Sequence, residues 1–143
     1  MSKILGTIEA IDFPEFEAHN VMAKIDTGAY TGALHCSSIK EHNHGSEKTI
    51  IFVPFGSDKI VEKDEFVIRY VRSSNGERER RYFIKTNIVI HGHKYPITLS
   101  LANRSEMKWP VLIGRRFLKQ NHFLVDPSRG NGYREQVKEI NDV

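Results

Sequence analysis

The residues best suited to chemistry are in the segment Asp26-Thr27-Gly28-Ala29, which directly follows the apolar run Val21–Ile25. The carboxylate should therefore lie where a strand ends in a turn. Two such carboxylates held together share one proton, because they cannot both ionise cheaply. The ionised one can activate a water molecule while the protonated one polarises a carbonyl group. Thr27 and Gly28 would supply a hydroxyl and an unobstructed amide that hydrogen-bond to the carboxylates.

The sequence contains a single Asp-Thr-Gly triplet, and no second Asp-Ser/Thr-Gly triplet could supply the partner carboxylate. A paired-aspartate mechanism therefore requires two copies of the chain, with Asp26 of each meeting across a twofold axis. We expect a homodimer whose interface and active site coincide, and an inactive monomer.

Seven histidines and one cysteine raise the question of a metal site. His42 and His44 are two residues apart, as are His91 and His93, and this spacing places both rings on one face of a strand. Both pairs lie in expected turns, and the sequence has no His-Glu-x-x-His pattern. We expect no metal and no other cofactor. If zinc is bound, the candidate ligands are His35, Cys36, His42 and His44.

Two other chemistries are not expected. Cys36 and His35 are neighbours, so in a strand they would point to opposite faces and could not form a nucleophile–base pair. The sequence also lacks a Gly-x-x-x-x-Gly-Lys-Ser/Thr loop that would hold the phosphates of ATP.

The elements that must position these residues are short strands. Apolar and β-branched runs predict strands over residues 4–11, 21–25, 48–55, 66–71, 81–90, 95–101, 111–113 and 123–125. The polar stretch Glu41–Lys48 is expected to be a loop, and Arg115–Gln120 a short helix after Gly114. Many short strands with frequent turns predict an all-β barrel or sandwich.

The segment Ser73-Ser74-Asn75-Gly76 carries the strongest hairpin signal, because Asn-Gly readily adopts the positive φ angles of a type I′ turn. A hairpin here would lie between the two apolar strands at 21–25 and 111–113 and is a candidate flap over a cleft. A second tight turn is expected at His91-Gly92-His93. Basic residues near the first hairpin could attract an acidic peptide. They are Arg72, Arg78, Arg80 and Arg81.

Length and composition indicate one domain over residues 1–143, with residues 128–143 as a loosely held tail. The net charge of +3 is too modest for the basic stripe of a nucleic-acid binder. No apolar run approaches the roughly 20 residues that span a bilayer, so no membrane association is expected. One cysteine and no apolar leader favour the cytoplasm.

Several motifs, in order along most of the chain, resemble one bacterial and archaeal family. They are Ala23-Lys24-Ile25-Asp26-Thr27-Gly28-Ala29, Ala33-Leu34-His35, Ser73-Ser74-Asn75-Gly76, Arg104-Ser105-x-Met107, Pro110-Val111-Leu112-Ile113-Gly114-Arg115-Arg116 and Val125-Asp126-Pro127. The family is labelled ATP-dependent zinc protease, resembles retropepsins, and is often encoded beside ATP-grasp glutamate ligases. The resemblance implies an acid-protease-like closed β-barrel.

It also implies an aspartic endopeptidase with Asp26, Thr27 and Gly28 as catalytic residues, acting on peptides or proteins that include acidic, glutamate-rich or glutamate-tailed ones. Two alternatives stay open: a non-catalytic peptide-binding domain of the same fold, and a zinc-dependent hydrolase. The candidate substrate-binding residues are Ala29, Thr31, Ser73, Ser74, Asn75, Gly76, Arg81 and Arg115.

Overall fold

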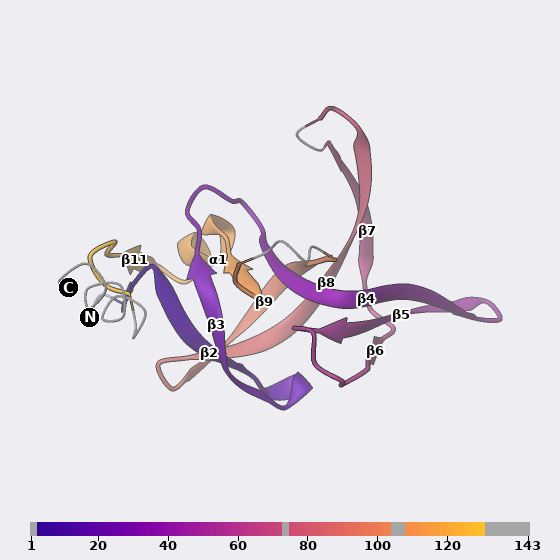
Figure 1. Ribbon diagram of the computed structural model, residues 1–143, viewed down its shortest axis with the longest axis horizontal. Helices are drawn as coiled ribbons and strands as arrows, with labels where there is room; N and C mark the ends of the chain where they lie inside the picture. The colour runs from indigo at the N-terminus through magenta and orange to yellow at the C-terminus, as the bar shows by residue number, and fades with distance from the viewer. Residues whose placement is uncertain (1–2, 73–74, 104–107, 131–143) are drawn as a thin grey trace.

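The computed structural model describes residues 3–72, 75–103 and 108–130, and strands make up most of them (Figure 1). The strands are β1 (Lys3–Leu5), β2 (Ile8–Phe13), β3 (Ala18–Ile25), β4 (Gly32–His44), β5 (Glu47–Pro54), β6 (Val61–Lys63), β7 (Val67–Arg72), β8 (Arg78–Ile90), β9 (His93–Ala102), β10 (Val111–Ile113) and β11 (Phe123–Val125). The helical segments are the 3₁₀ turn η1 (Pro14–Phe16) and the helix α1 (Arg115–Gln120). In the described part of the chain, neither helix is long or apolar enough to cross a membrane.

Strand β10 closes the barrel. Within the described residues, pairing runs in the order β3, β2, β8, β9 and β4, and β10 pairs with both β3 and β4, the two ends of this series. It lies parallel to β3 and antiparallel to β4, so the sheet returns to itself. The predicted all-β closed barrel with a short helix after Gly114 is therefore confirmed.

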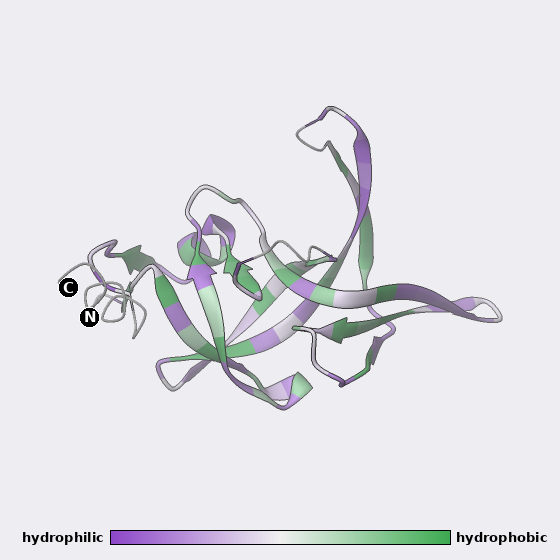
Figure 2. Ribbon diagram, viewed as in Figure 1, coloured by the Kyte–Doolittle hydropathy of each residue, from purple (hydrophilic) through white to green (hydrophobic). Residues whose placement is uncertain are grey.

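Strands β4 and β8, 13 residues each, extend beyond the barrel in two directions (Figure 1). β7 pairs with the first part of β8, and we call this hairpin the flap ribbon. β5 pairs with the second part of β4, and β6 pairs with the other edge of β5. We call residues 37–44 of β4 together with β5 and β6 the arm. The outer parts of β4 and β8 are mostly hydrophilic, whereas the barrel strands alternate (Figure 2).

The core fills the barrel and continues under the start of the arm. Alternate residues of β8, Ile84, Ile88 and Ile90, are buried together with Leu34 on β4 and Ile113 on β10. Burial of one face of each strand is the main source of stability in such a barrel. Two aromatic groups extend this core, one of Phe13, Phe16, Phe52 and Phe55, and one of Tyr95, Phe117 and Phe123 that holds α1 against the barrel.

The single strand predicted over residues 4–11 is wrong, because the chain breaks it at Gly6 and Thr7. The Gly6 amide donates to the buried Glu9 carboxylate at 2.7 Å, and the Thr7 amide donates to the Arg129 carbonyl. These hydrogen bonds take the place of continuous strand pairing at Gly6 and Thr7. As a result, β1 pairs with β11, whereas β2 is part of the barrel. A glycine inside a strand pattern is the sequence signal for such a break.

The predicted loop over Glu41–Lys48 is also wrong. β4 and β5 stay paired as far as His44 opposite Glu47, which leaves a two-residue turn at Gly45 and Ser46. The end of the arm is exposed on both faces, so its strands lack the apolar alternation that marks a half-buried strand.

Both predicted hairpins are confirmed, with a difference at the first. Arg72 lies opposite Arg78, so the connection between β7 and β8 is centred on Asn75 and cannot be a two-residue turn. The two-residue turn occurs instead at His91 and Gly92, whose φ angles of 50° and 79° fit type I′.

The predicted tail begins with residues that are held in place. The Arg129 carbonyl accepts the Thr7 amide, and Gly130 is buried. The rest of that tail, residues 131–143, lies outside the described part of the chain.

Candidate active site

Asp26 follows the last residue of β3, where β10 runs beside that strand. Ile113 is the register partner of Ile25, and the Asp26 amide donates to the Ile113 carbonyl at 2.8 Å. The Ile25 amide donates to the Thr7 carbonyl on the other side. Two segments remote in sequence, β10 and the residues before β2, thus fix the backbone that carries the carboxylate.

The turn after β3 orients the Asp26 side chain. The Gly28 amide donates to Asp26 Oδ1 at 3.0 Å, and the Ala29 amide donates to the Asp26 carbonyl at 3.2 Å. Asp26 is half-buried, while Thr27 and Gly28 are exposed. Among the described residues, Asp26 Oδ2 and the Thr27 hydroxyl have no hydrogen-bond partner, so the predicted hydroxyl contact to Asp26 is not present within one chain.

Two glycines permit the close crossing of backbones beside this turn. A Cβ atom at Gly114 would lie 2.5 Å from the Tyr30 carbonyl oxygen, and one at Gly32 would overlap the Leu112 carbonyl oxygen. Neither glycine has a positive φ angle. Glycine is therefore needed at both positions because a side chain would not fit, and not because of the backbone conformation. Gly114, which directly follows the strand predicted over residues 111–113, is therefore part of the site's framework.

Arg115 holds the turn from the other side. Its amide donates to the Ala29 carbonyl at 2.8 Å. Its Nη1 atom donates to the carbonyl oxygens of Gly28 at 3.1 Å and Thr27 at 3.4 Å, and the guanidinium lies 5.4 Å from the Tyr30 ring centroid. Arg115, named above as a substrate-binding candidate, thus contacts the Asp26 turn itself.

The other predicted substrate-binding residues fall in two places. Ala29 belongs to the Asp26 turn, and Thr31 lines a small hollow with Tyr30 and Arg116 beside α1. Arg81 lies on the flap ribbon. At the tip of the ribbon, Asn75 and Gly76 are exposed; Ser73 and Ser74 lie outside the described residues.

Three arginines in the first part of β8 already have partners on the protein. Arg81 pairs with Glu79 at 3.1 Å. Arg78 lies over the Tyr70 ring at 4.7 Å, a cation–π contact. Arg80 contacts the Glu41 carboxylate and lies 5.4 Å from the Tyr82 ring centroid. An acidic ligand would compete with these contacts.

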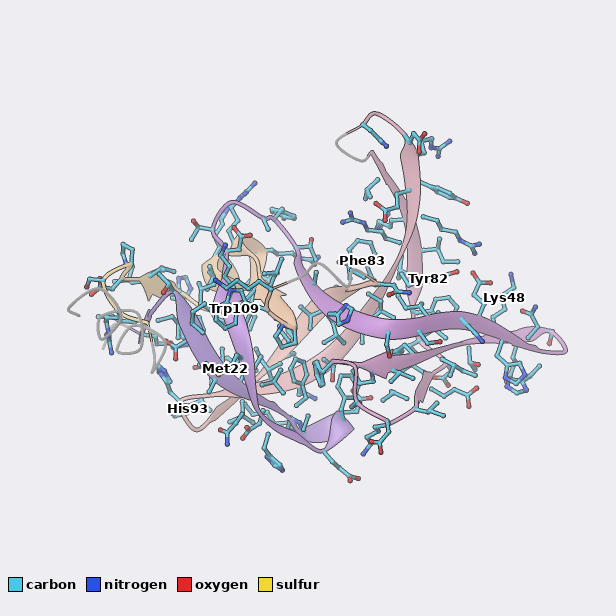
Figure 3. All side chains as sticks on the ribbon, viewed as in Figure 1. Met22, Lys48, Tyr82, Phe83, His93 and Trp109 are labelled. Carbon is cyan, nitrogen blue, oxygen red and sulfur yellow. The ribbon has the colours of Figure 1, made fainter. Side chains whose placement is uncertain are left out.

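The contact that anchors the flap ribbon to the arm was not predicted. The Tyr82 hydroxyl donates to Glu41 Oε1 at 2.7 Å, and Figure 3 shows Tyr82 where the ribbon passes β4. This bond, together with Arg80, lowers the pKa of the Glu41 carboxyl, while burial and then the bond to Glu41 raise the pKa of Tyr82. No pattern in the sequence pairs residues 41 apart, so no signal could have revealed it.

The four residues named as possible zinc ligands do not form one cluster. Cys36 is fully buried, and its burial raises the thiol pKa to about 12, so it stays protonated and is a poor ligand. His35 Nδ1 is buried and has no hydrogen-bond partner among the described residues. His42 and His44 do lie together, but with Glu62 rather than with Cys36.

Comparison with known proteins decides the family. Residues 4–135 match the family model described as RimB-like, retropepsin-like aspartic endopeptidase RimB. This chain belongs to the RimB-like family. A solved structure similar to it is that of Lpg0085, a protein of unknown function from Legionella pneumophila, with a TM-score of 0.74 and 26% identity over 91% of this chain and 97% of the other.

Sequences similar to this chain also occur within longer proteins. Two relatives named probable alpha-L-glutamate ligase, from Shewanella halifaxensis and Shewanella pealeana, are 35% and 34% identical to this chain over 87% of its length. The chain spans 28% of the length of each of these relatives. The name glutamate ligase therefore belongs to longer proteins, in which a segment similar to this chain is a minor part.

Proposed function

We propose that this RimB-like chain is an aspartic endopeptidase that hydrolyses peptide bonds through Asp26 and the Asp26 of a second copy. The observation that supports this most strongly is the Asp26 carboxylate, held at Oδ1 by the Gly28 amide and without a partner at Oδ2 in the described residues. One oxygen is positioned, and the other is available to water or to a second carboxylate.

The single carboxylate at the site favours a dimer. Among the described residues, no second carboxylate lies within hydrogen-bond distance of Asp26, and the Thr27 hydroxyl beside it is exposed and unpaired. A second copy would bring its own Asp26 against the first, and the two would share one proton. The ionised carboxylate takes a proton from water, which attacks the scissile carbonyl carbon, while the protonated one donates a hydrogen bond to the carbonyl oxygen.

The proposed substrate is an acidic chain, either a glutamate-rich peptide or a protein with a glutamate tail. β7 and β8 place Arg69 opposite Arg81, and like charges at directly opposite positions destabilise a strand pair unless an anion compensates them. Arg81 pairs with Glu79, whereas Arg69 has no ion pair among the described residues and is the charge that an acidic substrate would compensate. Proteins named glutamate ligases contain a similar segment. A hydrolase acting on glutamate chains would act on what such a ligase makes.

The test is cleavage of glutamate-rich peptides by wild type and by Asp26→Asn between pH 4 and 8, followed by mass spectrometry. Asp26→Asn keeps the size of the side chain but cannot ionise. We expect products from wild type, with or without chelator, and none from the variant. Binding without cleavage by a confirmed dimer would refute catalysis and leave a peptide-binding domain, and cleavage that a chelator abolishes would indicate a metal-dependent hydrolase.

A further inference from the structure

The outer face of the arm brings together two histidines and a glutamate. His42 and His44 lie two residues apart on β4, and Glu62 lies on β6. His42 is opposite Thr49 on β5, and Glu62 is opposite Ile51, two residues farther along the same strand. Because residues two apart share a face of a strand, all of these side chains lie on one face of the sheet.

The ligand atoms of the three side chains converge. His42 Nδ1 lies 3.8 Å and His44 Nε2 lies 3.4 Å from Glu62 Oε2, and all three atoms lie within 4.8 Å of one another. Neighbouring ligands at a tetrahedral zinc ion are about 3.3 Å apart when each bond is about 2.0–2.1 Å long. The three side chains are exposed, so small rotations suffice to reach that geometry.

Thr49, on β5, is hydrogen-bonded to the Glu62 carboxylate. The Thr49 hydroxyl donates to Glu62 Oε2 at 2.6 Å. This bond fixes the orientation of the Glu62 carboxylate toward the two imidazoles. Ionised carboxylate and neutral imidazole are the forms that bind metal ions, and a hydroxyl that orients a ligand is typical of metal sites.

We propose that His42, His44 and Glu62 bind one divalent transition-metal ion such as zinc. Two imidazoles and one carboxylate are ligands that zinc favours, and water would complete the coordination shell. The ion would join β4 to β6 across β5 and so hold the short edge strand β6 in the arm. The competing explanation is that His44 and Glu62 form only a hydrogen bond.

The site lies far from Asp26. Gly32 begins β4 next to the Asp26 turn, and His42 is ten residues farther along the strand, about 30 Å at a rise of roughly 3.3 Å per residue. Figure 1 shows the arm extending away from that turn, and Figure 3 shows Lys48, the neighbour of Thr49, on the arm. Zinc here would stabilise the arm and would take no part in activating water at Asp26.

Metal binding can be measured directly on untagged protein by calorimetric titration with Zn²⁺ and by the visible absorption of bound Co²⁺. We expect one equivalent of metal on wild type and on Asp26→Asn. His44→Ala and Glu62→Gln should each lose at least 10-fold in affinity, and Thr49→Val about 10-fold or more. His93→Ala removes an exposed histidine outside the cluster and should bind as wild type does.

A second measurement needs no variant. In histidine NMR spectra of wild type, adding Zn²⁺ should shift the imidazole signals of His42 and His44 before those of the other histidines, and the melting temperature should rise by several degrees at saturation. No saturable Zn²⁺ uptake, or uptake that is equal in wild type and His44→Ala, would overturn the proposal. Loss of metal in His93→Ala but not in Glu62→Gln would overturn it as well.

Discussion

The guanidinium group of Arg115 donates to the carbonyl oxygen of Gly28 at 3.1 Å, so a residue that follows β10 holds the turn that follows β3. The Gly28 amide in turn holds the Asp26 carboxylate. The position of that carboxylate therefore depends on a side chain that need not touch a substrate.

Replacing Arg115 by alanine should loosen the turn without unfolding the barrel. We expect the free energy of unfolding to fall by about 1 kcal/mol, because the lost hydrogen bonds are exposed. Peptide cleavage should fall about 10- to 100-fold, since a small misplacement of a catalytic group is costly. Amide exchange at Gly28 should become faster. Arg116→Ala, the exposed neighbour, is the control, and equal losses in both variants would contradict a positioning role.

Mixing wild type with Asp26→Asn tests the shared site. If one aspartate comes from each copy, a mixed dimer is inactive. At equal concentrations, with dimers fully formed, activity per wild-type chain should drop to about half, because half of the wild-type chains then pair with the variant. Activity that does not change on mixing would show that a single copy suffices.

Removing the Tyr82 hydroxyl should weaken the attachment of the flap ribbon to the arm, with the Arg80–Glu41 contact left in place. Tyr82→Phe removes the donor to Glu41 and should cost about 1 kcal/mol at pH 7. Because this bond lowers the folded pKa of Glu41 below its usual 4.5, its contribution is present above that pH and is lost as the pH falls through the folded value. Urea unfolding of wild type and Tyr82→Phe between pH 3 and 7 measures the difference in their free energies of unfolding. A difference that stays constant down to pH 3 would show that Glu41 is not the partner.

Gly32→Ala should destabilise the barrel, because its Cβ atom would overlap the Leu112 carbonyl oxygen on β10. We expect a loss of about 1–3 kcal/mol in urea unfolding. Gly45→Ala is a useful comparison: its Cβ atom meets nothing within 4 Å, although its φ angle of 65° makes alanine mildly strained. A Gly32 variant as stable as wild type would mean that β10 can move away from β4.

Cys36 should resist thiol reagents in the folded protein. With a pKa of about 12, roughly one thiol in ten thousand is ionised at pH 8, and the side chain is fully buried. Ellman's reagent should react with the protein only as fast as it unfolds, and at once in guanidinium chloride. Rapid reaction of the native protein would contradict this burial.

The barrel and the Asp26 turn could be predicted from the sequence because local patterns encode them. Apolar runs predicted β3 and β10, and the Asp-Thr-Gly triplet directly after the first run predicted the position of the turn. What could not be predicted depends on partners remote in sequence. Glu41 and Tyr82 are 41 residues apart, and Glu62 joins His42 and His44 only because β6 follows β5 in register.

The outer end of the arm, predicted as a loop over Glu41–Lys48, was missed for a different reason. Its outer strands are exposed on both faces, so residues 41–48 carry no apolar period and look like a loop. Their strand structure is determined by backbone pairing with each other, from Cys36 opposite Pro54 to His44 opposite Glu47. Alternation of apolar and polar residues marks a strand with one buried face, so a strand that is exposed on both faces does not show it.

The placement of β10 between β3 and β4 also sets when the site can exist during synthesis. Asp26 receives its backbone support from Ile113, and its turn is held by Arg115, so neither contact is available until nearly 90 more residues have left the ribosome. Contacts of such long sequence separation form late in folding. In a nascent chain, Asp26 therefore stays without its backbone support until β10 has been synthesised. A product truncated before β10 would lack the strand that completes both the barrel and the turn.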